Sequence, residues 1–180
     1  YSGILKFAAG WIVVFLIRLI PFRAPNIEPV MATLMPYSKR YGVGGAFLFG
    51  ALSIALFDLA TGKVGQWTLI TALAYGLVGI GSAFFFRART SSRKNYAVFA
   101  VIGTLFYDAV TGLSIGPLFF GQSFSEAFLG QIPFTLWHLG GNVAFALILS
   151  PALYRWIVIN PKLETEHIIR IIGRISGTRA

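Results

Sequence analysis

One predicted helix near the C-terminal end of the chain carries polar side chains that could bind a ligand. Gln131, Thr135, His138 and Asn142 follow one another at steps of four, three and four residues, so they share one helix face. A strongly apolar chain would not turn such a face toward lipid, and we expect it to point into a helix bundle. There it either forms hydrogen bonds between helices or lines a ligand cavity, and the sequence leaves both interpretations open.

Two aspartates could bring negative charge to the same interior. The pattern aromatic-Asp-x-x-Thr-Gly occurs at 57–62 and again at 107–112, which places Asp58 and Asp108 at equivalent positions. A charged side chain costs up to roughly 2.5–3.5 kcal/mol at the bilayer centre, so two such acids suggest one shared polar space. Alternatively, each aspartate lies at headgroup depth and caps its own turn, with Gly62 or Gly112 as the left-handed stop.

Aromatic side chains near these polar groups complete a candidate ligand site. Aromatic walls with a few oriented polar groups are typical of sites for heterocyclic small molecules. The candidate set is Trp67, Tyr107, Asp108, Gln131, Trp137, His138 and Asn142. Trp67 and Trp137 could instead belong to the aromatic belt at the membrane interface.

The sequence argues against an enzyme, a metal site and a bound cofactor. No second histidine lies at ligand spacing from His138, since His167 is in the tail, and the absence of cysteine removes thiolate sites and disulfides. Neither a nucleophile elbow nor a phosphate-binding Gly-Lys-Thr loop is present. We therefore expect no catalytic residues, no metal ligands and no cofactor, and any active transport would need a separate ATPase.

Composition indicates an integral membrane protein. Of the 180 residues, 56% have hydrophobic and 12% have charged side chains, and the mean hydropathy is +0.74. Alternating strand patterns are absent, which disfavours a barrel. The net charge of +9 is concentrated in short loops and in the tail, where membrane orientation explains it better than nucleic acid binding does. The chain begins at Tyr1 without methionine, so we expect further sequence ahead of it.

We expect an all-α membrane protein with a bundle of six transmembrane helices in residues 1–158 and a basic tail in residues 159–180. The predicted spans are 3–20, 26–38, 42–58, 66–86, 96–108 and 133–156, the second being short or tilted. The segment 111–129, rich in glycine and phenylalanine, looks like a long loop that dips into the membrane interface. Gly42, Ala46 and Gly50 are spaced four residues apart, which favours close helix packing within the protein or against a partner.

Lysine and arginine fall mainly on one side of this topology, at 39–40, at 87–94 and in the tail. By the positive-inside rule both termini are cytoplasmic in a multi-pass protein of the cell membrane. The acidic side chains of Glu28, Asp58, Asp108 and Glu126 then lie toward the outside. The tail at 162–179 alternates isoleucines with basic residues, which is typical of an amphipathic helix on the anionic inner leaflet, or of a segment that docks on a cytoplasmic partner.

Several motifs give the chain a family resemblance. They are RLIP at 18–21, PNIEP at 25–29, GQWT at 65–68 and PFTLWHLGGN at 133–142. Together they resemble the substrate-binding S components of energy-coupling factor (ECF) transporters, over most of residues 3–156. The resemblance implies a six-helix bundle in the lipid bilayer that captures a vitamin or related heterocyclic micronutrient from outside. It also implies partners, namely a membrane coupling subunit and two cytoplasmic ATPases.

The resemblance further implies where the ligand lies. In this family it is held near the outer face by the loop after the first helix and by the later helices, which here correspond to Asn26, Glu28, Trp67, Asp108, Trp137, His138 and Asn142. One feature departs from the family. Where members often have Ala-x-x-x-Ala in the first helix for docking the coupling subunit, this chain has Ala8 followed four residues later by Ile12.

Two rival interpretations remain open. The first is an independent secondary transporter that uses Asp58 and Asp108 for proton coupling, in keeping with the repeated pattern. The second is a structural membrane subunit, in which the polar helix face serves only to pack helices together.

Overall fold

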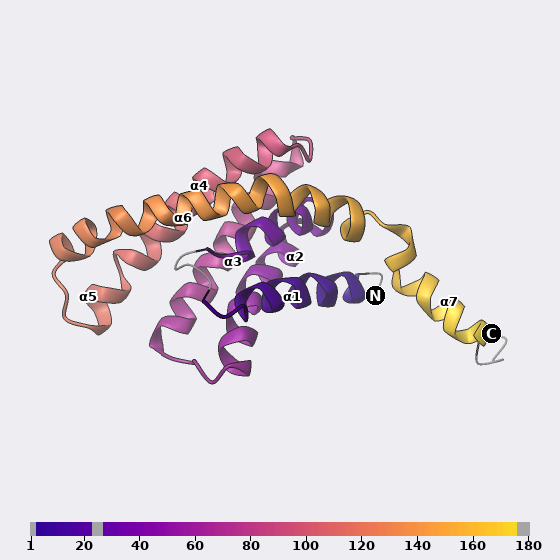
Figure 1. Ribbon diagram of the computed structural model, residues 1–180, viewed down its shortest axis with the longest axis horizontal. Helices are drawn as coiled ribbons and strands as arrows, with labels where there is room; N and C mark the ends of the chain where they lie inside the picture. Colours follow the sequence, from indigo (N-terminus) through magenta and orange to yellow (C-terminus); the bar gives the residue numbers. More distant parts are fainter. Residues whose placement is uncertain (1–2, 23–26, 176–180) are drawn as a thin grey trace.

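The computed structural model describes residues 3–22 and 27–175, and within these ranges the regular structure is helical (Figure 1). The long helices are α1 (Ile4–Arg18), α2 (Val30–Ala60), α3 (Gln66–Arg87), α4 (Arg93–Gly112) and α6 (Phe124–Leu153). The shorter elements are α5 (Ile115–Phe119), a π-helical turn η1 (Tyr154–Val158), a 3₁₀ turn η2 (Pro161–Leu163) and α7 (Thr165–Ile175). The prediction of an all-α protein is confirmed.

Within the described residues, four helical segments are long and apolar enough to cross a membrane, namely Val30–Ala60, Gln66–Arg87, Arg93–Phe119 and Phe124–Val158. A membrane protein is therefore the class that this structure supports. The first predicted span is also a helix, α1, but its 15 residues give it a length of only about 22 Å.

The predicted second and third spans correspond to the two parts of α2, which meet at a break at Gly42. The two parts fold back on each other, because the Tyr37 and Phe49 rings stack with centroids 4.4 Å apart. Helical structure runs through α2 from Val30 to Ala60, and it is broken only at Gly42, where φ is 67° and ψ is −163°. Glycine tolerates a positive φ because it has no Cβ. The break therefore falls where the sequence predicted the connection between these two spans, although no loop separates them.

The prediction of a long loop at 111–129 is wrong. α4 continues to Gly112, α5 follows at once, and α6 begins at Phe124, so Pro133 lies inside α6 instead of opening it. The start of α6 is fixed by a capping box, in which the Glu126 backbone N–H donates to Ser123 Oγ at 3.3 Å and the Ser123 backbone N–H donates to Glu126 Oε2 at 2.8 Å. The Ser-x-x-Glu pattern at 123–126 was the sequence feature that could have placed this helix start.

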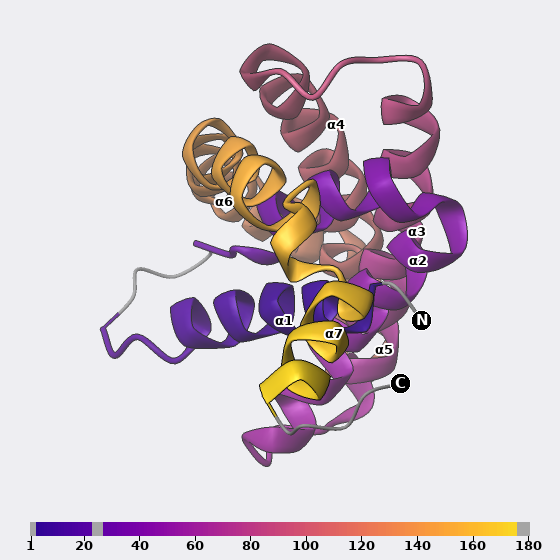
Figure 2. The same ribbon diagram turned by 90° about the vertical axis from the view of Figure 1, so that its right-hand side faces the viewer.

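Two helix pairs form the body of the molecule: α2 packs along α3, and α4 packs along α6 (Figures 1 and 2). Glycines let α2 and α3 approach closely. A Cβ at Gly79 would lie 2.7 Å from the carbonyl carbon of Ala46, and a Cβ at Gly50 would lie 2.8 Å from that of Tyr75. The small residues at 46 and 50 are thus used for packing inside this protein.

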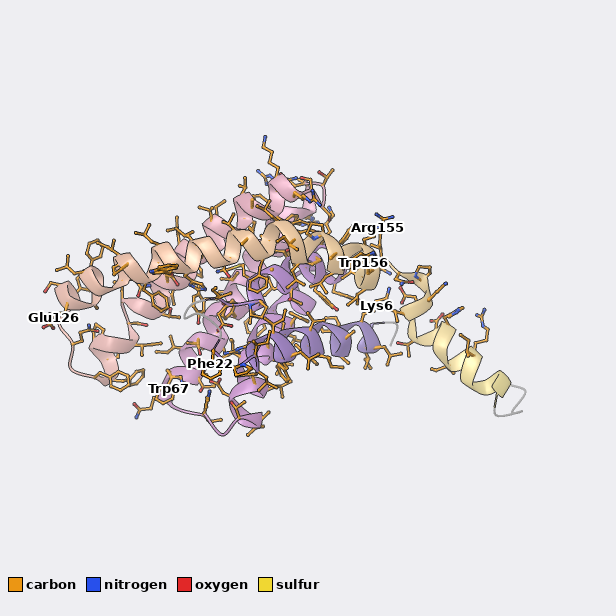
Figure 3. The ribbon with its side chains drawn as sticks, in the orientation of Figure 1. Lys6, Phe22, Trp67, Glu126, Arg155 and Trp156 are labelled. Atoms are coloured by element: carbon orange, nitrogen blue, oxygen red, sulfur yellow. The ribbon has the colours of Figure 1, made fainter. Side chains whose placement is uncertain are left out.

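The C-terminal arm, residues 159–175, leaves the body beside the start of α1 (Figures 1 and 3). The fully buried Lys6 holds it there, because Lys6 Nζ donates to the Val158 carbonyl at 2.8 Å and to Glu164 Oε1 at 2.6 Å. Arg40 Nη2 lies 3.7 Å from the same Glu164 oxygen. Viewed from this end, α7 is the element nearest the viewer (Figure 2). Glu164 therefore ties the arm to both α1 and α2.

Acidification is expected to release this arm. The hydrogen bond from Lys6 lowers the pKa of Glu164 below its usual value of 4.5. A carboxylate with a lowered folded-state pKa stabilises the docked arm at pH values above the undocked pKa, and this contribution is lost as the pH falls through the docked pKa. Because the chain has no native cysteine, spin labels at Glu166→Cys and Arg93→Cys can report the distance between arm and body. The distribution should be narrow at pH 7 and should broaden as the pH falls through the lowered pKa of Glu164.

The control for this prediction is Glu164→Ala, which should give the broad distribution at both pH values. A distribution that stays narrow in Glu164→Ala would show that Glu164 does not hold the arm.

Candidate ligand-binding site

A buried acid–base pair joins α4 to α6. Asp108 Oδ1 lies 2.7 Å from His138 Nδ1, and the two residues are 1% and 2% exposed. An ionised Asp108 carboxylate can only accept a hydrogen bond, and opposite it the N–H at His138 Nδ1 is the donor. The other ring nitrogen, His138 Nε2, is available to form a hydrogen bond with another group.

A second polar contact lies one helical turn away. Asn142 Nδ2 donates to Thr104 Oγ1 at 2.8 Å, and both residues are fully buried. The contacts 104–142 and 108–138 run in opposite directions along the two helices, so α4 and α6 are antiparallel here. His138 and Asn142 therefore face the interior, as the periodicity predicted.

The outer part of the same α6 face is less deeply buried. Gln131 Nε2 donates to Thr135 Oγ1 at 3.1 Å, so these two predicted residues contact each other. The Gln131 amide also lies directly over Gly112, where a Cβ would overlap it. Gly112 is inside α4 with a helical backbone, so its predicted role as a left-handed stop is wrong, whereas Gly62 does have a positive φ of 67°.

Three buried polar atoms around the pair have no hydrogen-bond partner among the described residues. They are Asp108 Oδ2, His138 Nε2 and Asn142 Oδ1. Buried polar atoms in proteins are almost always paired, and each unpaired one costs about 1–3 kcal/mol. Two of the three are oxygen acceptors, and the third is an imidazole nitrogen that can accept or donate. A guest with N–H or O–H groups would match this set.

A hollow of about 320 Å³ lies between α4 and α6 beside the pair. Its wall is mainly aliphatic and aromatic, and its polar lining residues are Asp108, Gln131 and Thr135. The volume falls at the lower end of the range of small-molecule sites, and the mixture of apolar wall with few polar groups is typical of them. Asp108 belongs both to the hollow and to the buried pair.

Aromatic rings cover the pair from α3, α4 and α6. The Tyr107 ring centroid lies 4.3 Å from that of Tyr75 and 5.8 Å from that of His138, and the Phe134 ring meets His138 edge-on at 5.7 Å. Tyr107 was a predicted site residue. Tyr75 and Phe134 were missed in that role, although Phe134 precedes His138 by four residues on the same helix.

The two predicted tryptophans lie apart from this pair. Trp137 is 71% exposed, because a residue next to His138 points about 100° away around the helix. Trp67 is 41% exposed and lies at the α2–α3 turn, packed over Gly65 (Figure 3). Their exposure gives no support for stacking on a guest at the Asp108–His138 pair. The alternative that they belong to the membrane interface stays a prediction.

Asn26 lies outside the described residues, and Glu28 forms an ion pair. Arg18 Nε lies 3.3 Å from Glu28 Oε2, and the Arg18 guanidinium lies 3.9 Å from the Phe57 ring centroid. Both charges are within electrostatic range of Tyr107. Glu28 thus belongs to the same end of the molecule as the predicted site, together with Arg18, which the sequence did not single out as a site residue.

Asp58 stabilises its own turn. Thr68 Oγ1 donates to Asp58 Oδ2 at 2.7 Å and accepts from the Gly65 backbone N–H at 3.1 Å. The Lys63 backbone N–H donates to the Asp58 carbonyl at 2.8 Å. Of the two equivalent aspartates, Asp58 therefore acts as a turn residue, and Asp108 pairs with a base in the interior.

The described part of the chain brings together no group of three side chains that could hold a metal ion. Comparison of the chain with protein-family models, with characterised proteins and with solved structures gives no match. The case for a function therefore depends on the geometry of the α4–α6 interface.

Proposed function

We propose that this chain is the membrane-embedded substrate-capture subunit of an ATP-driven importer of the ECF type. Its substrate would be a vitamin or a related heterocyclic micronutrient. The observation that supports this proposal is the buried Asp108–His138 pair, which has unpaired polar atoms at Oδ2 and Nε2 and whose Asp108 lines a hollow of about 320 Å³. A helix contact that served only packing would leave few polar atoms unpaired.

Each site residue has a role in this proposal. Asp108 accepts a hydrogen bond from the substrate or pairs with a positive group on it. His138, Asn142 and Gln131 orient the substrate, and Tyr107 stacks against it with Tyr75 behind. The substrate forms hydrogen bonds to the buried atoms that otherwise have no partner, and these bonds supply the binding energy.

The proposed topology has six passes with both termini in the cytoplasm. The six passes are α1, the two parts of α2 on either side of Gly42, α3, α4 and α6. The basic α3–α4 connection and the C-terminal arm then face the cytoplasm of the cell, where a membrane coupling subunit and two ATPases would bind. The substrate enters from the opposite side.

A copurifying small molecule is the expected signature of this function. Mass spectrometry of the protein in mild detergent should identify it, and readdition at a hundred times its dissociation constant should add roughly 2.7 kcal/mol to the free energy of unfolding. A thermal-shift assay with vitamins measures this effect. Asp108→Asn should abolish the shift, because it removes the charge from the site.

The matched control is Asp58→Asn, at the equivalent position of the repeated pattern. It should retain the ligand-induced shift, since Asp58 bonds Thr68 in its own turn. If no small molecule shifts the melting temperature, or if both variants lose the shift equally, a capture site at Asp108 is excluded.

A proton-coupled secondary transporter is the second candidate, and one observation favours it. A buried carboxylate–imidazole pair can take up and release a proton, as such pairs do in transporters. Uptake of the copurified molecule into liposomes that contain this protein alone, driven by a pH gradient, would support this candidate over an ATP-driven importer.

A further inference from the structure

The connection between α3 and α4 gathers positive charge. Arg87, Arg89, Arg93 and Lys94 lie on it or at the start of α4, and Lys39 reaches it from α2. Lys39 Nζ donates to the Phe86 carbonyl and, at 2.8 Å, to the Arg89 carbonyl. The Lys39 ammonium is therefore fixed at the C-terminal end of α3, close to the arginines of the connection.

Two adjoining hollows open at this cluster. The first, of about 530 Å³, is lined by Lys39, Arg87, Arg89, Thr90, Ser91 and Tyr154, together with Ala88. The second, of about 410 Å³, shares Lys39 and Arg87 and extends between α2 and α3 along residues that include Val43, Ala83 and Phe84. The first hollow is polar and basic, whereas the second combines the same two cations with an apolar wall.

The second hollow lies at the break in α2. Gly42 lines it, and a Cβ built on Gly42 would have no atom within 4 Å. Because the helix is interrupted there, α2 leaves room beside the last turns of α3. Val43 and Phe84 are 41% and 58% exposed, so this wall faces the surroundings of the bundle, where lipid tails lie beside a membrane helix.

Electrostatics favours an anion in the first hollow. Its described lining includes three cations and no acidic side chain. Like charges at such range repel one another. Arg93 and Lys94 add to the repulsion, because they occupy the first turn of α4, where the helix dipole is also positive. A phosphate group would offset all of these interactions at once.

We propose that the two hollows together bind one anionic phospholipid. Its phosphate lies in the first hollow against Lys39, Arg87 and Arg89, and an acyl chain lies along Val43, Ala83 and Phe84. Basic pockets between transmembrane helices recognise anionic headgroups in this way. The inference does not depend on the proposed transport function, since the hollows lie apart from the Asp108–His138 pair.

Native mass spectrometry in mild detergent tests the proposal, with added phosphatidylglycerol or phosphatidylcholine as probe. The unmodified protein should retain one phosphatidylglycerol under activation that strips phosphatidylcholine. Arg87→Gln/Arg89→Gln should weaken this retention by about fivefold for each charge removed, or roughly 25-fold together. Both arginines are exposed, so the variant should fold, which its melting temperature checks.

A matched variant, Arg155→Gln/Lys162→Gln, removes the same charge from the C-terminal end and should keep the bound phosphatidylglycerol. A second variant, Thr90→Glu, places a negative charge in the first hollow and should abolish binding. The proposal would be overturned if the unmodified protein retained phosphatidylcholine as well as phosphatidylglycerol. It would also be overturned if the matched variant lost phosphatidylglycerol as readily as Arg87→Gln/Arg89→Gln does. Displacement of phosphatidylglycerol by millimolar inorganic phosphate would also overturn it, because the hollow would then be a site for free phosphate.

Discussion

His138→Leu is expected to lower the free energy of unfolding by about 3–5 kcal/mol, since it strands the buried Asp108 carboxylate without its partner. Asp108 is only 1% exposed, so its carboxylate would gain little hydration in place of the imidazole. Equilibrium unfolding in mixed micelles measures the loss. Asp108→Leu should cost less, because it removes the carboxylate, which is the group that is costly to bury without a partner.

The double variant Asp108→Leu/His138→Leu should recover most of this stability. Two leucines fill the space with apolar groups and leave neither charge unpaired, and such replacements of buried ion pairs are often neutral or stabilising. The same double variant should no longer carry the copurified small molecule. The double variant would thus regain stability without regaining the bound molecule.

The combination of recovered stability and lost ligand in the double variant distinguishes a capture subunit from a structural one. If the polar face of α6 served only to hold helices together, the double variant would recover stability and no bound molecule would be lost with it. A third outcome, equal losses for His138→Leu and Asp108→Leu, would mean that neither residue is charged in the folded protein. The pair would then be an ordinary hydrogen bond between neutral groups.

Periodicity was sufficient to predict which side of α6 faces inward. A polar stripe at steps of three and four residues in an apolar chain has one favourable orientation, and His138 and Asn142 are buried as expected. The sequence analysis also placed Asp108 in the same set as His138, and the two residues are in contact. It did not name Thr104 as the partner of Asn142, because contacts between helices depend on register. Tyr75 was missed as a site residue for the same reason.

Local sequence features explain why the predicted helix boundaries around 111–129 were wrong. The rich supply of glycine and phenylalanine at 111–129 suggested irregular structure, yet Ser123 and Glu126 begin a helix that continues through Pro133. The tryptophans were assigned to the site for their aromatic character and from the family resemblance. The one-residue offset between His138 and Trp137 is enough to turn the latter outward.

Gly79→Val is expected to be the most damaging substitution between α2 and α3. Its Cβ would overlap the Ala46 carbonyl group, and the atom it meets is backbone, which cannot rotate away as a side chain could. The helices would have to separate, and α2–α3 is the most extensive helix pair in the molecule. Overpacking of a well-packed core costs about 1–3 kcal/mol, and we expect a loss at or above the upper end of that range.

Gly81→Ala, two residues along the same helix, is the matched control for this loss. The nearest atom to a Cβ there is Phe99 Cζ at 3.9 Å, which is an ordinary contact, so the change should be neutral or stabilise α3 by up to about 1 kcal/mol. Melting temperatures in one detergent compare the two variants. Because Tyr75 lies one turn from Gly79 and packs on Tyr107, Gly79→Val should also weaken substrate binding, whereas Gly81→Ala should not. Equal melting temperatures for the two variants would mean that α2 and α3 do not pack this closely in the membrane.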